Sequence, residues 1–375
     1  MGVEIQNFVK LWTAAVWSQF YTYYVVSRIP SGLLTRLVSL VPIFYLFIIL
    51  PLSLSSFHLG APTVLYLVWL ANFKLLLFAF NLGPLSSHPP LSLPHFIATA
   101  LLPIKYKDDP THFRPSSSND AQNSSIKRRP TSQITPEIMR KRRQFKIIRF
   151  TIKLVVLVAA ISLYRYRPHL HPCLVTAIYC CHMYLGIEFV LALTAVPVRA
   201  ILGLELARQF NEPYLATSLQ DFWGRRWNLI VSTILRQIVY DPVRSIFTPK
   251  LGRNSGLAAA TLATFLVSGL MHEVLYFYLS RESPTWEVTL FFVVQGICVT
   301  LEIYVKKAVA GRWRLHRAAS GLLTVAFVGV TSAWLFFPQL IRYGVDLRVI
   351  EECHAFLSFL GNILSLPTSY WRRKL

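Results

Sequence analysis

The chain has 375 residues, of which 54% are hydrophobic, and its 38 Lys and Arg outnumber 17 Asp and Glu for a formal net charge of +21. Apolar runs recur along most of this length, which excludes a soluble globular protein and predicts a single membrane domain over residues 1–375. The basic segments lie between these runs, and no groove-reading or base-stacking module is visible, so we expect no nucleic-acid partner. The positive charge instead suits the anionic, cytoplasmic face of a lipid bilayer.

Eight apolar runs are long enough to cross about 30 Å of hydrocarbon as helices. In chain order they lie at residues 8–27, 37–57, 61–82, 147–164, 173–198, 257–279, 288–309 and 318–340. No cleavable signal peptide precedes the first run, which is expected to remain as an anchor. Lys and Arg gather in alternate connections, which predicts a lumenal N-terminus and two long cytoplasmic loops. The expected fold class is an all-α polytopic membrane protein with about eight transmembrane helices and additional interfacial amphipathic helices.

The first long loop, residues 105–146, is rich in Ser, Asn and basic residues. Its polar stretch at 115–125 and its basic cluster Arg140-Lys141-Arg142-Arg143 predict a disordered cytoplasmic linker that ends at the membrane surface. A solvated tether is the simplest interpretation of this loop, and a regulatory segment is the alternative.

The second long loop, residues 199–255, interleaves aromatic and basic residues, which is typical of a segment at the lipid headgroup interface. Apolar positions from 223 to 240 recur at helical spacing and predict an amphipathic helix lying on or dipping into the bilayer. We therefore expect a cytoplasmic or interfacial loop that contributes to a site.

An ionisable pair, His272-Glu273, lies within the apolar run at 257–279. Such groups are costly in hydrocarbon and are candidates for a functional site, although a histidine bonded to a neighbouring helix is the plainer alternative. Gly269, one turn earlier, is expected to leave space beside the imidazole for a substrate. A zinc-protease pattern needs a second His four residues on, where Tyr276 stands, and the five cysteines lack metal-ligand spacing, so we expect no metal.

The segment from Asp221 to Asn228 gathers aromatic rings, two guanidiniums, a carboxylate and an amide. Asn228 can donate a hydrogen bond to a carbonyl or a developing oxyanion. Arg225 and Arg226 can bind the phosphates of a soluble acyl carrier such as coenzyme A, with interfacial anchoring as the alternative. Asp221 is expected to neutralise one of these arginines. Two further ring residues are expected to line one helical face, namely Trp223 and Trp227.

Other polar groups at membrane depth are Lys74, His182, Glu188 and Glu302. Packing pairs, such as Lys74 with a glutamate, are the simplest interpretation. A path for protons or ions would use the same residues, so a transporter stays open as an alternative function.

Several motifs resemble those of the plant wax synthase family, a branch of the membrane-bound O-acyltransferases. They are Ser218-Leu-Gln-Asp-Phe-Trp-Gly-Arg-Arg-Trp-Asn228, Asp241-Pro-Val-Arg244, Ser268-Gly-Leu-Met-His-Glu273, Trp69-Leu-Ala-Asn72 and Gly311-Arg-Trp-Arg314. The resemblance implies an acyl-CoA-dependent esterification in the endoplasmic reticulum membrane, with the fatty alcohol or the sterol as acceptor. It also implies that the catalytic histidine is His272 and that its polar partner is Asn228.

We therefore hypothesise direct transfer of an acyl group from acyl-CoA, a co-substrate, to a long-chain alcohol, with no cofactor. His272 acts as the general base and Asn228 holds the carbonyl. The substrate-binding candidates are Asp221, Trp223, Arg225, Arg226, Trp227 and Glu273. A sterol acyltransferase is the nearest alternative, and a lipid or ion transporter and a non-catalytic membrane scaffold are the alternatives from other classes. Oligomeric state and acyl-chain preference stay open.

Overall fold

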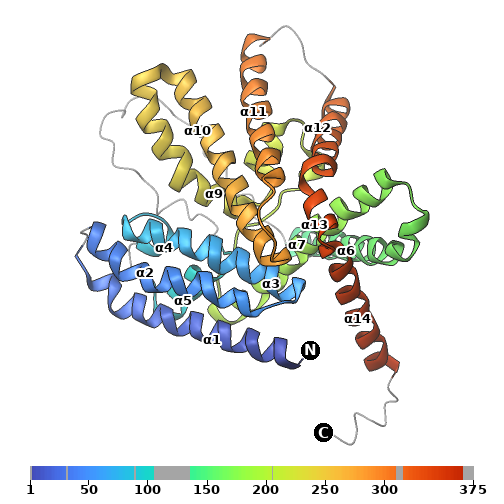
Figure 1. The fold of residues 1–375 in the computed structure, drawn as a ribbon, viewed down its shortest axis with the longest axis horizontal. Coiled ribbons are helices and arrows are strands. Elements are labelled where there is room, and N and C mark those ends of the chain that lie inside the picture. Colours follow the sequence, from blue (N-terminus) through green and yellow to red (C-terminus); the bar gives the residue numbers. More distant parts are fainter. Residues whose placement is uncertain are drawn as a thin grey trace, which may run out of the picture. The chain divides into compact units, whose positions relative to one another are not determined.

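The computed structural model describes residues 2–30, 33–87, 90–104, 136–204, 206–309 and 316–365. These residues are helical almost throughout, and their elements include no strand (Figure 1). Seven helical segments among them are long and apolar enough to cross a membrane, which confirms a polytopic all-α membrane protein. They are Leu34–Ser53, Phe57–Ala79, Ile147–His169, Pro172–Leu202, Leu229–Ser280, Glu287–Ala308 and Arg317–Phe336.

The predicted first span at residues 8–27 is not among these seven segments. Helix α1 (Gly2–Tyr24) does form there and has the length of a span. Its polar residues, which include Glu4, Lys10 and Gln19, lower the mean hydropathy of this helix. The described part of the chain thus has seven candidate spans by length and composition, against about eight expected.

The chain divides into two compact units, one made of Met1–Lys105 with Val190–Leu375 and the other of Tyr106–Phe189. The second unit holds α6 (Pro136–Leu163), η5 (Tyr164–His169) and the first part of α7 (Pro172–Leu202). Within it, Lys153 Nζ lies 2.6 Å from Glu188 Oε1 and pairs the two intramembrane charges.

Residues 105–135 of the loop predicted to be disordered, 105–146, lie outside the described residues. Helix α6 begins at Pro136, so residues 136–146 are helical where a loop was expected. Pro suits the first position of a helix, and the following Glu, Met, Arg, Lys and Gln residues are strong helix formers.

The N-terminal part of the first unit is a layer of helices around an apolar core. It comprises α1, η1 (Val26–Arg28), α2 (Leu33–Ile49), η2 (Leu50–Ser53), α3 (Phe57–Val64), η3 (Leu65–Ala71), α4 (Asn72–Ala79), η4 (Pro84–Ser86) and α5 (Leu93–Leu101). Helices α3, η3 and α4 form one continuous run whose middle is a wide π-helical turn. Leu40, Phe47, Leu67 and Leu75 are among the fully buried residues of this core.

Lys74 is buried in this layer but does not pair with a glutamate, contrary to the simplest interpretation of the sequence. Its Nζ donates to the carbonyl oxygens of Thr99 at 2.7 Å and Leu102 at 2.6 Å. These carbonyls belong to the C-terminal end of α5, where a cation is favoured by the unpaired carbonyl groups and the helix dipole. Lys74 therefore joins α4 to α5.

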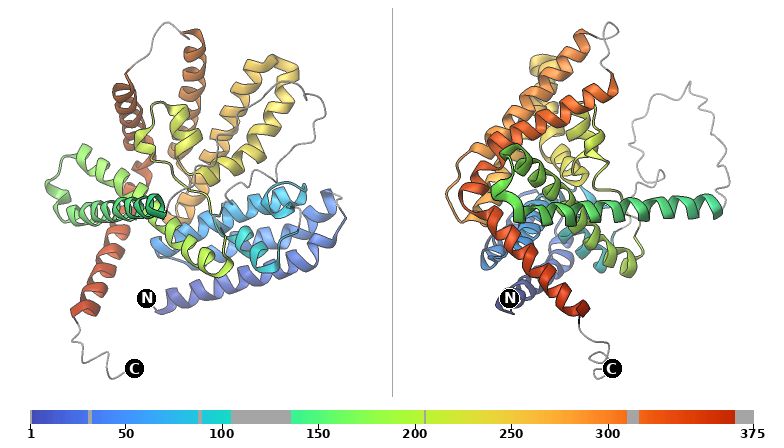
Figure 2. Two further views of the ribbon diagram at one scale, coloured as in Figure 1. Left: turned by 180° about the vertical axis from the view of Figure 1, so that it is seen from behind. Right: turned by 90° about the vertical axis from the view of Figure 1, so that its right-hand side faces the viewer.

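The C-terminal part of the first unit is built on a helical hairpin. Helices α9 (Leu229–Leu235), η8 (Arg236–Tyr240) and α10 (Asp241–Ser280) are continuous, but Gly252 has φ 83° and folds the chain back on itself (Figures 1 and 2). A Cβ at Gly256 would collide with the Thr248 side chain and lie 2.9 Å from the Thr248 Cα, so the bend is tight.

The described residues in the C-terminal part of this unit form eight further helical elements. They are η6 (Pro213–Leu215), α8 (Leu219–Asp221), η7 (Phe222–Arg226), α11 (Glu287–Ala308), α12 (Arg317–Thr331), η9 (Ser332–Phe336), α13 (Pro338–Arg342) and α14 (Val345–Ser365). Helix α11 packs along α10, and the rings of Trp223, Phe265, Phe291 and Phe292 meet at their interface.

Candidate functional site

His272 lies on the returning arm of α10, and its orientation is fixed by a hydrogen bond to its own helix. Its Nδ1 lies 2.7 Å from the carbonyl oxygen of Ser268. Because a carbonyl can only accept, Nδ1 carries the hydrogen, and the neutral ring then has a lone pair on Nε2. The arrangement leaves Nε2 as the atom that can take a proton from a bound molecule.

Aromatic rings from three other segments surround the His272 imidazole, which is half-buried. The ring centroids of Trp69, Phe292 and Phe336 lie 5.1, 4.3 and 6.0 Å from that of His272. Trp69 belongs to η3 and Phe336 to η9, and both segments are π-helical. Single π-helical turns insert a residue, redirect side chains and are frequent at functional sites.

Gly269 serves helix packing and leaves no space beside the imidazole, contrary to the expectation from the sequence. A Cβ at this position would lie 2.9 Å from the Thr289 Cα and 3.3 Å from the Phe292 Cβ. The missing side chain lets α10 and α11 approach closely, as small residues do between membrane helices. This approach brings Phe292 against His272.

Glu273 is buried, and its carboxylate is bound at the start of α11. Its Oε1 accepts a hydrogen bond from the Thr289 backbone N–H at 3.2 Å. The helix dipole of α11 favours a negative charge beside its first turn, where the Glu273 carboxylate of α10 binds. Its second oxygen, Oε2, is buried without a hydrogen-bond partner among the described residues.

Asn228 is the N-cap of α9. Its side-chain Oδ1 accepts from the Val231 N–H at 3.4 Å, and its backbone is left-handed at φ 34° and ψ 71°. Among the residues that the structure describes, the side-chain Nδ2 donates to no other group. The amide N–H groups are thus available to a ligand.

The amphipathic helix predicted from position 223 begins six residues later, at Leu229. Residues Phe222–Arg226 form the separate π-helical turn η7, which ends at Trp227 with ψ 127°. The left-handed backbone at Asn228 changes the direction of the chain between the two segments. Trp223 and Trp227 therefore lie outside α9, and their ring centroids are 6.2 Å apart.

The hairpin places Asn228 and His272 at comparable heights. Asn228 precedes the Gly252 bend by 24 residues and His272 follows it by 20. At a rise of 1.5 Å per residue the two arms measure about 36 Å and about 30 Å. The amide and the imidazole therefore lie toward the same end of the hairpin.

Gln295 connects the Trp223 motif to the helices around His272. It is fully buried, accepts from the Trp223 Nε1–H at 3.1 Å and donates to Thr331 Oγ1 at 2.8 Å. The Trp223 ring in turn contacts Phe292 at 5.8 Å. Sequence reasoning did not single out Gln295, although a lone amide in an apolar span was a signal for it.

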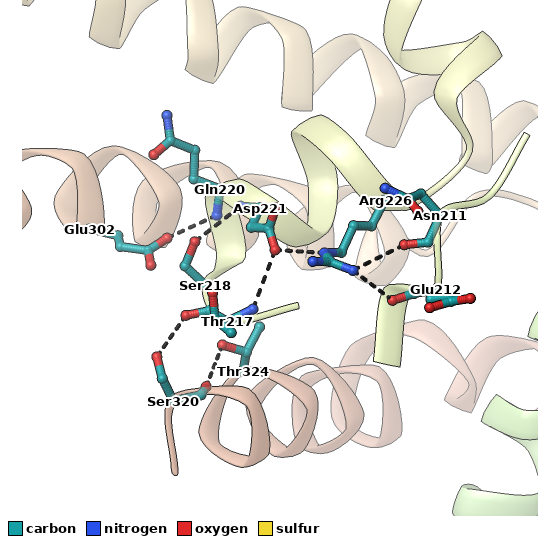
Figure 3. A network of polar contacts seen from close by, with 10 residues as sticks. All are labelled: Asn211, Glu212, Thr217, Ser218, Gln220, Asp221, Arg226, Glu302, Ser320 and Thr324. Carbon is teal, nitrogen blue, oxygen red and sulfur yellow. Dashed lines mark hydrogen bonds and ion pairs between the residues drawn. The ribbon is translucent and has the colours of Figure 1, made fainter. Parts of the chain in front are cut away.

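Arg226 is half-buried and contacts three neighbouring residues, as Figure 3 shows. Its Nε lies 2.6 Å from Asp221 Oδ2, and its Nη1 donates to the carbonyl oxygens of Asn211 and Glu212. Asp221 therefore neutralises one of the two arginines, as expected. The guanidinium of Arg226 fixes the loop, whereas Arg225 is exposed.

Arg225 lines a cavity of about 750 Å³ together with Arg226, Lys306 and Arg317. A neighbouring cavity of about 480 Å³ is lined by Arg244, Arg253 and Lys307, and Gln220 borders both cavities. The backbone N–H of Gln220 donates to Glu302 Oε2 at 2.9 Å, which fixes the wall between them (Figure 3). The two cavities form a basic region that suits a ligand with several phosphates.

Comparison with known proteins bears on this arrangement. Residues 206–294, which include Asp221–Asn228 and His272, match the model of the membrane bound O-acyl transferase family. The chain is 52% identical to a long-chain-alcohol O-fatty-acyltransferase of Simmondsia chinensis over 93% of this chain and 94% of that protein. It is 41% identical to acyl-CoA–sterol O-acyltransferase 1 of Arabidopsis thaliana, over 97% and 99% of the two chains. It is also 44% identical to probable long-chain-alcohol O-fatty-acyltransferase 1 of the same plant, over 94% and 96%.

Proposed function

The chain is an acyltransferase that belongs to the membrane-bound O-acyltransferase family, and we propose that it transfers a fatty acyl group from acyl-CoA to a long-chain alcohol. The alcohol O–H bond and the thioester C–S bond break, and an ester C–O bond forms. The alcohol proton leaves with the thiol of coenzyme A. The endoplasmic reticulum membrane is the proposed location.

The proton acceptor in this proposal is Nε2 of His272, and the Ser268 hydrogen bond is the observation that carries it. With Nδ1 engaged by the Ser268 carbonyl, the neutral ring presents its basic nitrogen to the substrate. Nε2 takes the proton of the alcohol as the oxygen attacks the thioester carbon, and then returns it to the leaving thiolate. A thioester is already activated, so no covalent intermediate on the protein is required.

Asn228 is the proposed donor to the thioester carbonyl. Its Oδ1 is used in capping α9, so its Nδ2–H₂ group is the part that can stabilise charge on the carbonyl oxygen. The comparable heights of Asn228 and His272 in the hairpin support this pairing of donor and base.

The basic cavities beside Arg225 and Arg244 support coenzyme A as the acyl carrier. Their arginine and lysine side chains can bind the phosphates of the carrier while its acyl chain extends between the membrane helices. The apolar rings around His272 suit the alkyl part of an alcohol. The relatives named for alcohols favour the straight-chain acceptor over a sterol.

Expression in a yeast that lacks its own neutral-lipid synthesis tests the proposal. Membranes receive labelled acyl-CoA with a fatty alcohol or with a sterol, and the products are separated by thin-layer chromatography. We expect wax ester from wild type, and a loss of about 10²-fold or more in His272→Ala at an equal amount of inserted protein. His354→Ala, at an exposed histidine of α14, is the control and should keep full activity.

Retained ester synthesis in His272→Ala would contradict the assigned base. Sterol ester in place of wax ester would contradict the proposed acceptor. Passage of lipid or ions without any new ester bond would instead favour the transporter.

A further inference from the structure

The indole N–H of Trp69 is a buried hydrogen-bond donor that the steps above do not use. Trp69 is 3% exposed and lies in the π-helical turn η3. Its Nε1 has no acceptor in the described parts of the chain. A buried donor without a partner destabilises the fold, so its retention here requires an explanation.

The indole ring that carries this donor lies directly beside the imidazole of the proposed base. The centroids of the Trp69 and His272 rings are 5.1 Å apart, and the rings meet edge to face at 81°. A substrate group held at Nε2 of His272 is consequently a neighbour of the indole as well. Trp69 reaches this place from η3, whereas the Asn228 motif approaches from the other arm of the hairpin.

A second unpartnered polar atom lies one turn along the same run. The Asn72 Nδ2 donates to the Val68 carbonyl at 3.1 Å, but its Oδ1 is buried without a donor among the described residues. The two residues are separated by only three positions in one continuous helical run. Two buried polar atoms without partners so close together in the chain indicate a space that receives a polar group.

We propose that the Trp69 N–H donates a hydrogen bond to the thioester carbonyl oxygen of the acyl donor and is a further catalytic residue of this site. The inference rests on the proposed function. An indole N–H has no lone pair for hydrogen bonding, so it cannot take the proton of the alcohol. As the alcohol oxygen adds to the carbonyl carbon, the carbonyl oxygen gains negative charge, and Trp69 stabilises this charge together with Asn228. When the C–S bond breaks, an electron pair of this oxygen re-forms the C=O bond, and the negative charge leaves with the thiolate, which takes the proton from His272.

The variant Trp69→Phe tests the inference because it removes the N–H and keeps most of the ring. We expect kcat to fall by about 10²-fold, as for removal of one oxyanion donor. KM for acyl-CoA and for the alcohol should change little, since the interaction is made mainly in the transition state. Rates are expressed per folded enzyme, measured by size-exclusion chromatography in detergent.

Trp12→Phe is the matched control. Trp12 is half-buried and its ring contacts Tyr66 of η3 at 6.3 Å, but its Nε1 already donates to Thr63 Oγ1 at 3.4 Å. The same substitution there should leave kcat unchanged. An acyl-CoA analogue with a methylene in place of the carbonyl should inhibit wild type and Trp69→Phe equally, because it offers no oxygen to the indole.

A Trp69→Phe enzyme that keeps kcat within about twofold, or that changes only KM, would overturn the inference. The proposed function would still stand if wild type forms ester and His272→Ala does not. If wild type forms no ester from acyl-CoA, the proposed function itself fails, so the two failures are distinguishable.

Discussion

Gly269 of α10 and Thr289 of α11 are in backbone contact, and this contact sets the separation of the two helices that enclose His272. A second glycine, on the other helix, allows the same close approach, since a Cβ at Gly296 of α11 would lie 2.9 Å from the Phe265 Cβ of α10. Each helix thus supplies one glycine to the interface. The ring of Phe292 reaches the imidazole because the helices are this close.

Gly269→Ala should therefore damage both stability and activity. The added methyl group meets backbone atoms that cannot move aside, and overpacking of this kind costs about 1–3 kcal/mol. We expect a lower melting temperature of the detergent-solubilised protein and slower ester synthesis. Gly329→Ala in α12, where a Cβ would meet no atom within 4 Å, is the control and should be neutral or slightly stabilising.

The two functions of the Asn228 side chain can be separated by substitution. Asn228→Asp keeps the oxygen that caps α9 and tolerates the left-handed backbone, but it lacks the amide N–H groups. We expect a fall in kcat of about 10²-fold with an unchanged melting temperature. Asn228→Ala loses cap and donor together, so it should be both inactive and less stable. Normal turnover of the Asp variant would exclude Asn228 as the carbonyl donor.

Replacement of Arg225 by Ala is expected to affect substrate binding, whereas replacement of Arg226 by Ala is expected to affect stability. Arg225 is exposed at the basic cavity, so its loss should raise KM for acyl-CoA by about fivefold, or about 1 kcal/mol, with less effect at high salt. Arg226 holds Asp221 and two carbonyls, so its loss should lower the free energy of unfolding by about 1.5–3 kcal/mol. Steady-state kinetics at two salt concentrations and thermal unfolding distinguish the two. Equal effects from both variants would contradict the assignment.

Glu352 of α14 binds the start of α3. Its carboxylate accepts from the backbone N–H groups of Phe57 at 2.8 Å and His58 at 3.0 Å, from Ser56 Oγ at 3.0 Å and from His58 Nδ1 at 2.7 Å. Burial alone raises the pKa of this carboxyl, but the hydrogen bonds outweigh it and lower the pKa from 4.5 to about 2.

The lowered pKa of Glu352 predicts how stability depends on pH. As the pH falls, the unfolded chain takes up this proton near its ordinary pKa of 4.5, before the folded protein does. The stabilisation is therefore complete above about pH 4.5 and is lost as the pH falls toward 2. Glu352→Gln should lower the melting temperature at pH 7. The difference in melting temperature between this variant and wild type should become smaller below pH 4.5. Glu351→Gln, at the exposed neighbouring position, should behave as wild type.

The sequence was sufficient for the features that depend on composition and on single unusual residues. Long apolar runs predicted the spanning helices because a bilayer demands about 20 consecutive apolar residues. His272 was recognised because an imidazole in such a run is rare. The predicted span at α1 is helical as expected, but it is not among the seven segments that are long and apolar enough to cross a membrane.

Features that depend on contacts between distant segments were not predictable. Gly269 was interpreted as open space, but only the position of Thr289 decides whether a glycine is empty or filled. Trp69 and Gln295 gain their significance from helices that lie far away in the sequence. The π-helical turns η3, η7 and η9 differ from α-helix by one residue each, a difference that apolar periodicity cannot resolve.

The heights of the proposed base and of the proposed carbonyl donor are both set by their distance along the chain from the bend at Gly252, each on its own arm. An insertion of one turn in a single arm would shift the height of one residue relative to the other by about 5.4 Å. An equal insertion in both arms would keep them level and move the pair as a unit. The depth of the proposed reaction in the bilayer can therefore change without altering the relative heights of Asn228 and His272 only when both arms are lengthened together.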